Sequence, residues 1–600
     1  MGELQFQTSV APTGNFDQLI ELMTRRGPDD HGFWSDDLYC RLGFRRLAVI
    51  DLSRDANQPM VVDGRFALVF NGELYNFREL RSELESQGVN FKTAGDAEVV
   101  LQALIRWGKD ALNRFNGMFA LGFYDVHEQS LLLARDPVGI KPLYALISRD
   151  GVVFASQYDQ ILAHPWSERR QVSTEALGLY LRLGYIPAPY ALLEHTLMIE
   201  PGCWLEATAG GRLRKGRYFR FPVYQQADLH GNEAYEAVDA AVTSAVRRQM
   251  VSDVPLGTFL SGGIDSPLVA AKAVAAGNGQ LKAFTIGNGD NTLDETDAAG
   301  NYARELGLNH LIEDYTADKA LTWLDKVIDA CNEPLADYSI FPTMLVSCLA
   351  RRDVTVMLSG DGGDELFWGY TQRFGPVLDL ATSFRSPRWW RAGRRGISRL
   401  SRSENGHQVP GWPTIGDWYR GIHSRISDRT LANMFTTIPA WPEEFDLFRY
   451  SGWKQDDTAQ WLRWNELTGH LTRVLLKVDR ASMYHSLEVR VPLLDREVLD
   501  VAARVDWQSC LDLAGRTGKK PLRSALARHV DFQSMDKLGF SVPMDEWLRG
   551  PLVPVFRDVV LGRMEIVGLP IRRANLETYF NEHVEGQADH SRWLWTLLFL

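Results

Sequence analysis

The sequence predicts an α/β protein with two unlike domains: a layered αββα domain, then a doubly wound parallel sheet with helical additions. Its 600 residues are too many for one compact core, so at least two domains are expected. Residues 1–205 contain short apolar segments separated by turn formers, with helix-like segments at 78–87 and 96–107. Beyond them strand-like and helical segments alternate, as in a parallel sheet. The glycine- and charge-rich segment 206–232 is expected to be a linker before a second domain at 233–600.

Several short segments are expected to be strands because they are apolar and rich in β-branched or aromatic residues. In the first domain they are 46–52, 65–77, 118–125, 130–136 and 151–157, and in the second 254–260, 282–287 and 354–360. Sheets packed face to face between helices would give the first domain its layers. From about 370 to 475 the sequence is rich in Trp and Arg and is expected to be helical.

Composition and charge exclude several classes of protein. Acidic residues exceed basic ones by 76 − 65 = 11, which argues against a nucleic-acid partner. The five cysteines are scattered without a C-x-x-C pair, so neither a disulfide framework nor a zinc site is expected. No basic-then-apolar leader begins the chain. The terminal stretch WLWTLLFL falls well short of the roughly 20 residues of a membrane helix. We therefore expect a cytoplasmic protein that does not span a membrane.

A glycine-rich loop predicts a phosphate-binding site. In FLSGGIDSP (259–267) an apolar strand ends at Leu260, and a helix is expected from Ser266, a plausible N-cap, with Pro267 as its first residue. The glycines allow several N–H groups to face one anion, and the helix N-terminus adds partial positive charge. Asp265 would repel a bare phosphate, which favours a role as a magnesium ligand.

A second loop, LSGDGGDE (358–365), places Asp361, Asp364 and Glu365 after another apolar strand. Ligands of open α/β sheets bind at the carboxyl edge of the strands, so both loops are expected at one crevice. There Asp364 could join Asp265 on magnesium. A tight strand-to-helix turn without a ligand is the alternative for either loop alone, and the presence of both disfavours it.

These loops and further motifs resemble the asparagine synthetase family, in which a class II glutamine amidotransferase domain is fused to an ATP-pyrophosphatase synthetase domain. The matching motifs include RRGPDDHGFW (25–34), NGELYNFRELR (71–81), RDPVGIKPLYA (135–145), EPLADYSIFPT (333–343), LLKVDRASMYHSLEVRVPLLD (475–495), GKKPLR (518–523) and DKLGFSVPMDEWLRG (536–550). The resemblance implies a ligase in which a carboxylate attacks the α-phosphate of ATP. An acyl-adenylate and pyrophosphate form, and ammonia then attacks the acyl carbon. ATP and Mg²⁺ are the implied cofactors, and a homodimer is expected by analogy.

The resemblance also implies roles for particular residues of the second domain. Asp361, at a position where asparagine synthetases often carry Glu, and Lys537 are implied to be catalytic in adenylate formation. Asp265 and Asp364 are implied to hold magnesium. The implied ATP-binding residues are Phe259, Leu260, Ser261, Gly262, Gly263, Asp265, Ser266, Ile286, Ser359 and Gly360.

In the first domain the resemblance implies a glutamine site. Arg46 would bind the glutamine carboxylate, Asp96 its α-amino group, and Asn71 with Gly72 would form an oxyanion hole. The implied glutamine-binding residues are Arg46, Leu47, Ala48, Val49, Ile50, Asn71, Gly72, Glu73 and Asp96. For NGELYN taken alone, a hairpin with a tight Asn-Gly turn is the alternative.

The nucleophile of such a glutamine site is missing from the sequence. These domains use an N-terminal Cys exposed when Met is removed, whereas position 2 is Gly. Leu4, Phe6, Thr8 and Val10 still alternate as the family's first strand would. We expect no glutamine hydrolysis by this mechanism. A different true N-terminus, the use of free ammonia, and another amine donor are the three explanations left open.

Aspartate is the expected acceptor. The alternative is an amidotransferase or amide-forming cyclase acting on a sugar carboxylate of a surface polysaccharide or on a peptide natural product. Arginines at three- and four-residue steps in 384–402 predict one basic helix face: Arg388, Arg391, Arg395, Arg399 and Arg402. That face is either simply solvated or a docking surface for an anionic acceptor, polymer or membrane.

Overall fold

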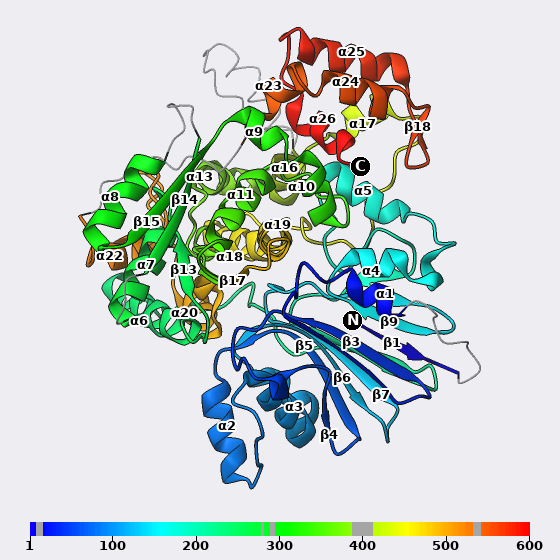
Figure 1. Ribbon diagram of the computed structural model, residues 1–600. Helices are drawn as coiled ribbons and strands as arrows, with labels where there is room; N and C mark the ends of the chain where they lie inside the picture. The colour runs from blue at the N-terminus through cyan, green and yellow to red at the C-terminus, as the bar shows by residue number, and fades with distance from the viewer. Residues whose placement is uncertain (8–15, 278–280, 289–294, 387–411, 532–541) are drawn as a thin grey trace.

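The computed structural model describes residues 1–7, 16–277, 281–288, 295–386, 412–531 and 542–600. Figure 1 shows two bodies: a blue and cyan one built on two stacked sheets, and a green-to-red one built on a parallel sheet with many helices. The predicted αββα domain and the predicted doubly wound parallel sheet are both confirmed. Within the described residues, no helix combines the length and apolar character that crossing a membrane requires.

Two six-stranded antiparallel sheets form the first body. Their strand orders are β10-β8-β9-β1-β3-β2 and β12-β11-β7-β6-β5-β4. The strands are β1 (Gly2–Gln5), β2 (Asp30–Ser35), β3 (Cys40–Arg46), β4 (Met60–Val62), β5 (Phe66–Leu74), β6 (Gly117–Asp125), β7 (Ser130–Arg135), β8 (Tyr144–Ile147), β9 (Gly151–Ala155), β10 (Thr196–Met198), β11 (Cys203–Thr208) and β12 (Leu213–Arg217). Buried apolar side chains such as Leu4, Leu42 and Leu133 fill the space between the sheets.

Helices cover the outer faces of this sandwich. Helices α1 (Phe16–Glu21) and α4 (Tyr158–Ala163) contact the first sheet, and α3 (Asp96–Trp107), with α2 (Phe77–Ser86) beside it, contacts the second. The second sheet also takes in β11 and β12, so it runs into the segment expected to be a linker. Paired strands there satisfy backbone groups that an exposed linker would leave to water.

The strand predicted at 46–52 is wrong, because β3 ends at Arg46 and residues 47–52 form a loop. The Arg46 guanidinium lies inside that loop, where it donates to the carbonyl oxygens of Ser53, at 2.8 Å, and of Asp51. Asp51 has φ of 56°, outside the strand region. A buried side chain thus takes the loop carbonyls that a neighbouring strand would otherwise bind.

The second body is built on a five-stranded parallel sheet with the order β15-β14-β13-β16-β17. Its strands are β13 (Leu256–Phe259), β14 (Lys282–Asn288), β15 (Asn309–Tyr315), β16 (Val356–Leu358) and β17 (Glu488–Arg490). Strand order reverses between β13 and β16, so a crevice is expected at their carboxyl ends. Figure 1 shows helices α6 (Gly231–Gln249), α7 (Asp265–Ala276) and α8 (Thr296–Leu306) on one side of the sheet, and α11 (Ile340–Arg351) with α19 (Leu471–Met483) on the other.

Candidate functional site

A large cavity lies where β13 and β16 end, and we call it the strand-end cavity. Its volume is about 1120 Å³. All the residues predicted to bind ATP or magnesium line it, together with Asp361: Phe259, Leu260, Ser261, Gly262, Gly263, Asp265, Ser266, Ile286, Ser359, Gly360 and Asp364. The structure therefore brings both predicted loops to one crevice. Lys537 and the arginines from Arg388 to Arg402 lie outside the described residues.

The two loops touch each other, and glycine makes the approach close. A Cβ at Gly360 would lie 2.5 Å from the backbone nitrogen of Ser266, and a Cβ at Gly363 would lie 2.5 Å from Oδ1 of Asp265. Any side chain at either position would push the loops apart. Glycine at these two positions therefore lets the carboxylates of the second loop come close to the first loop.

Asp265 and Asp364 converge on a single cation, the side chain of Lys519. Its Nζ lies 2.5 Å from Oδ2 of Asp265 and 2.7 Å from Oδ1 of Asp364. Lys519 is buried and comes just before α22 (Lys520–Leu526), 254 residues along the chain from Asp265. No site role was predicted for Lys519; its only signal was its place in GKKPLR. The three side chains mark one point in the cavity where positive charge is held by two carboxylates.

Other groups of the two loops are oriented by short hydrogen bonds. The Ser359 hydroxyl donates to Asp361 at 2.6 Å, which fixes that carboxylate on the cavity wall. The hydroxyls of Ser261 and Ser266 lie 2.9 Å apart. The Gly262 N–H donates to Glu295 at 3.2 Å, and Glu295, which no prediction included, also lines the cavity. Donors and acceptors of the loop are therefore held in place on the cavity wall.

Glu365 is the acid of the second loop that lies deepest. It is 2% exposed, and the Tyr370 hydroxyl donates to it at 2.6 Å. Burial, with the neighbouring charge of Asp364, raises the pKa of Glu365 to about 8. At neutral pH this carboxyl is mostly protonated, so it adds little negative charge to the second loop.

A second cavity, of about 100 Å³, lies at one end of the sheet sandwich, and we call it the sandwich cavity. Of the predicted glutamine-binding residues, all but Ala48 line it: Arg46, Leu47, Val49, Ile50, Asn71, Gly72, Glu73 and Asp96. Met483 and Glu488 of the second body complete its wall. The sandwich cavity is thus closed by the parallel-sheet domain, which sequence motifs alone did not indicate.

Three of the predicted glutamine-binding residues already make hydrogen bonds to other groups of the protein. The Nη atoms of Arg46 donate into its own loop. Asn71 Nδ2 donates to Ser156 Oγ at 2.8 Å, so its amide is oriented by the neighbouring sheet. Asp96 accepts from the Leu74 N–H at 2.8 Å, and burial raises its pKa to about 6.

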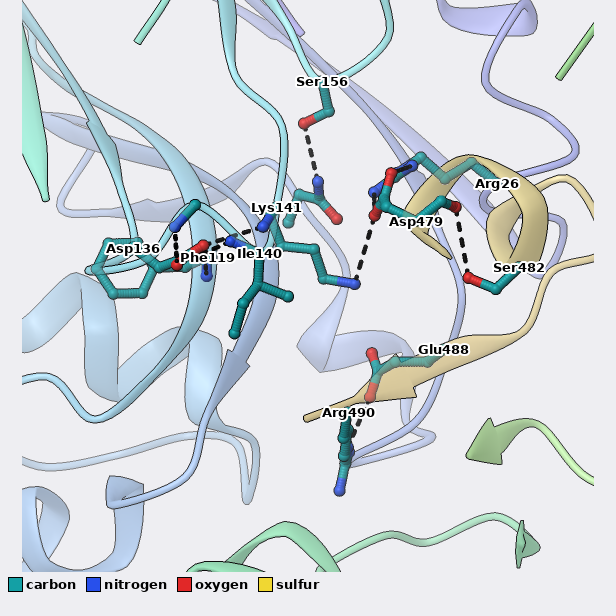
Figure 2. Close-up of polar contacts among 12 residues, drawn as sticks. Arg26, Phe119, Asp136, Ile140, Lys141, Ser156, Asp479, Ser482, Glu488 and Arg490 are labelled. Atoms are coloured by element: carbon teal, nitrogen blue, oxygen red, sulfur yellow. Dashed lines mark hydrogen bonds and ion pairs between the residues drawn. The ribbon is translucent and has the colours of Figure 1, made fainter. Parts of the chain in front are cut away.

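Charged side chains cross from one body to the other beside the sandwich cavity. Arg26 makes two hydrogen bonds to Asp479, at 2.8 and 2.7 Å, and Lys141 Nζ lies 3.8 Å from the same carboxylate. Figure 2 shows Lys141 reaching from the first domain toward Asp479, with Glu488 and Arg490 of β17 nearby. Arg490 bonds Glu488 at 2.8 Å and lies 3.4 Å from Glu73. The two bodies therefore share a buried ionic interface at this cavity.

No cysteine lines the sandwich cavity in the part of the chain that the structure describes. Met1 lines it, and the Met1 amino group donates to the Gly43 carbonyl at 2.9 Å. Gly2 instead faces the space between the sheets, where an added Cβ would lie 2.4 Å from the Phe154 ring. Cys40 is buried, and burial keeps the pKa of its thiol well above the ordinary value. The position beside the cavity is thus that of Met1, not Gly2.

Comparison with known proteins identifies the family. A family model described as asparagine synthase matches residues 237–600, and one described as a glutamine amidotransferase domain matches residues 2–219. Asparagine synthetase (glutamine-hydrolyzing) 1 of Bacillus subtilis (strain 168) is 30% identical over 98% of this chain and 94% of its own length. Asparagine synthetase (glutamine-hydrolyzing) 3 of the same organism is 28% identical over 85% of this chain and 81% of its own length. A Mycobacterium tuberculosis (strain ATCC 25618 / H37Rv) relative is 33% identical over 96% of this chain and 91% of its own length. This chain therefore belongs to the asparagine synthase family, and its first domain is a glutamine amidotransferase domain.

Proposed function

We propose that the protein is an ATP-dependent ligase that converts the side-chain carboxylate of aspartate to an amide. The carboxylate would attack the α-phosphate of ATP, releasing pyrophosphate, and ammonia would then displace AMP from the acyl carbon. The observation that carries this proposal is the meeting of two strand-end loops, with Asp265 and Asp364 on one cation, inside a cavity of about 1120 Å³. The names of the relatives support aspartate as the acceptor.

The loop after β13 would bind the pyrophosphate. Ser261, Gly262 and Gly263 line the cavity just before the N-terminus of α7, so the positive end of the helix lies beside them. Their N–H groups donate to the side chains of Ser266, Glu295 and Ser261, and would donate to phosphate oxygens when ATP binds. Phe259, Ile286 and Tyr315 give apolar surface beside it for an adenine ring. Such a cradle orients ATP and stabilises charge that grows on the leaving phosphates.

The residues present fit magnesium. Two carboxylates from different loops converge on one point, and oxygen ligands of this kind are what Mg²⁺ prefers beside phosphates. In the described part of the chain no group of three His, Cys, Asp or Glu side chains is arranged as a metal site, so phosphate and water oxygens would supply the other ligands. Asp265 and Asp364 would hold the ion, which supplies neutralising charge to the phosphates. Lys519 occupies that point now and would move toward a phosphate oxygen.

Asp361 and Lys537 are proposed to act in adenylate formation. Asp361 is oriented by Ser359 at the edge of the cavity. We propose ammonium as the working amine donor, because no cysteine thiol lies at the sandwich cavity in the described residues.

The test supplies purified protein, its N-terminus checked by mass spectrometry, with ATP, magnesium and aspartate. Asparagine and pyrophosphate are followed with ammonium and, separately, with glutamine. We expect both products with ammonium. If no pyrophosphate is released with ammonium and none with glutamine, aspartate is excluded as the acceptor and another carboxylate is indicated.

A further inference from the structure

Part of the strand-end cavity is lined by cations that none of the ATP-binding loops supplies. Arg473 and Lys477 come from α19, Arg592 from α26 (Ser591–Leu598), and Arg425 from the segment after α16 (Ile415–His423). Asp337 is the acid that faces them. Four cationic side chains thus face one carboxylate, which leaves an excess of three positive charges on this wall.

Arg425 is the buried member of this group, and its guanidinium is not fully hydrogen-bonded. It is 8% exposed, and its Nε and Nη1 atoms have no hydrogen-bond partner among the described residues. A buried, unsatisfied guanidinium costs free energy unless something else binds it. Burial and the charges of Arg473 and Arg592 lower the pKa of Arg425 to about 9. The lowered pKa agrees with several positive charges lying close together on this wall.

Asp337 does not neutralise the group. Its carboxylate lies 3.4 Å from Arg473 Nε, and its other bonds go to the hydroxyl and the N–H of Ser339. Although burial alone would raise it, Arg473, Lys477 and Arg425 hold the pKa of Asp337 below its ordinary value. Lys477 and Arg592 have no ion pair with any described residue.

The neighbouring charges are already satisfied. Arg373 pairs with Glu466 at 3.0 Å, and His423 lies 3.0 Å from the same carboxylate. Burial lowers the pKa of both His423 and His470, so neither adds a positive charge near neutral pH. The excess positive charge is therefore confined to Arg425, Arg473, Lys477 and Arg592, which we call the cationic wall.

We propose that the cationic wall, through Arg425, binds a second anionic group of the acceptor, a carboxylate or a phosphate separate from the carboxylate that is amidated. An arginine offers two parallel N–H donors to either anion, which gives both affinity and orientation. Lys519 and the loop after β13 serve the ATP phosphates, so the cationic wall is left for the other substrate. That the anion belongs to the acceptor rests on the proposed function, whereas the existence of the anion site does not.

The experiment measures binding, so it does not depend on turnover. Full-length protein is saturated with magnesium and α,β-methylene-ATP, whose α–β bond is not cleaved and whose phosphates occupy the loop after β13. Three probes are then titrated by calorimetry: succinate with two carboxylates, 3-phosphoglycerate with a carboxylate and a phosphate, and butyrate with one carboxylate. We expect one of the two dianions to bind at least about tenfold more tightly than butyrate. Which dianion is preferred names the second group.

Arg425→Gln is expected to abolish that preference while leaving the affinity for α,β-methylene-ATP within about threefold of wild type. The matched control is Arg149→Gln, whose side chain is 92% exposed, and it should keep the preference. If Arg425→Gln does not fold, as judged by its thermal midpoint, Lys477→Gln tests the same wall at a half-buried residue of α19. Equal affinity for all three probes in wild type overturns the proposal, as does a preference that survives the variants. A loss of nucleotide affinity with unchanged dianion binding would assign the wall to ATP instead.

The two proposals fail separately. If aspartate is not amidated but a dianion binds through Arg425, the site stands and aspartate is the wrong acceptor. If aspartate is amidated but no probe prefers the wall, the function stands and the second-anion site is wrong.

Discussion

The strand-end cavity and the sandwich cavity differ in how the fold makes them. The first is large, and short loops at the ends of β13 and β16 carry its acids. The second is about a tenth of its volume, and residues from both sheets and from the other domain enclose it. A site on strand-end loops keeps its chemistry within a few residues of sequence, whereas a site enclosed by several elements depends on how the domains meet.

Helix α19 joins the two regions. Arg473 and Lys477 face the strand-end cavity from one part of the helix, while Asp479 and Met483 meet the sandwich domain a turn further on. Strand β17 makes a similar link, since the Ser359 N–H donates to the Arg490 carbonyl at 2.9 Å while Arg490 lies 3.4 Å from Glu73. Packed residues of α19 and β17 therefore connect the two cavities directly. Substitutions at either cavity can test how the two sites differ.

The largest effect is expected where the domains meet. Asp479→Asn leaves Arg26 and Lys141, both buried, without their counter-charge. Breaking a buried ion pair from one side costs about 3–5 kcal/mol of unfolding free energy, which denaturant unfolding would measure. Asp500→Asn, which removes an exposed pair with Arg496, should cost about 0.5 kcal/mol or less. Equal losses in both variants would show that the interface contributes no more than a surface pair.

Asp364→Asn should lower pyrophosphate release about 100-fold or more, because it removes a carboxylate that would hold magnesium, whose positive charge would stabilise the leaving phosphates. The rate is measured with ATP, magnesium and the acceptor at saturation. Asp318→Asn is a matched control on an exposed residue of the same domain. An Asp364→Asn rate within a few-fold of wild type would remove this carboxylate from the site.

A cysteine inserted between Met1 and Gly2 should create glutaminase activity at least about tenfold above the parent, since removal of Met would place a thiol and an amine beside the sandwich cavity. Gly2→Cys is the matched control. Its Cβ would lie 2.4 Å from Phe154 and 2.7 Å from Leu42, so it should lower the thermal midpoint and add no activity. Glutamate release from glutamine is the measurement. Activity in Gly2→Cys alone would show that the first strand is in a different register.

The smallest expected effect is a pH dependence at the sandwich cavity. The pKa of Asp96 is raised from 3.8 to about 6, whereas glutamine's α-amino group stays protonated throughout this pH range. Affinity for glutamine should therefore rise several-fold between pH 5 and 7, as the ionised fraction of Asp96 rises from about a tenth to about nine-tenths. Because the folded state holds this proton more tightly than the unfolded chain, Asp96 also makes the free energy of unfolding fall as pH rises from 3.8 to about 6.

Calorimetric titration of glutamine at several pH values checks this dependence, and Asp96→Asn provides the comparison. The variant should bind more weakly and show a flat pH profile. A flat profile in the parent protein would mean that Asp96 does not contact the α-amino group.

Local sequence was enough to predict the strand-end loops. Ser261 to Ser266 and Ser359 to Glu365 follow strands directly, so a strand, a glycine turn and a helix start place their groups without reference to the rest of the chain. Residues 46–52 show the limit of the same reasoning. Their apolar, β-branched composition favours a strand, but the buried guanidinium of Arg46 binds the loop carbonyls instead.

By itself the sequence determined the two-domain architecture, the facing acids Asp265 and Asp364, and the absence of a cysteine at position 2. Each of these features depends only on residues that are neighbours in the sequence or on the identity of one residue. Only the tertiary structure decided that Lys519 bridges the two acids, that Met1 rather than Gly2 lines the sandwich cavity, and that Arg425 joins Arg473 and Arg592 on one wall. Those contacts join segments up to hundreds of residues apart, and the packing of helices and domains, which sets them, has no local sequence pattern.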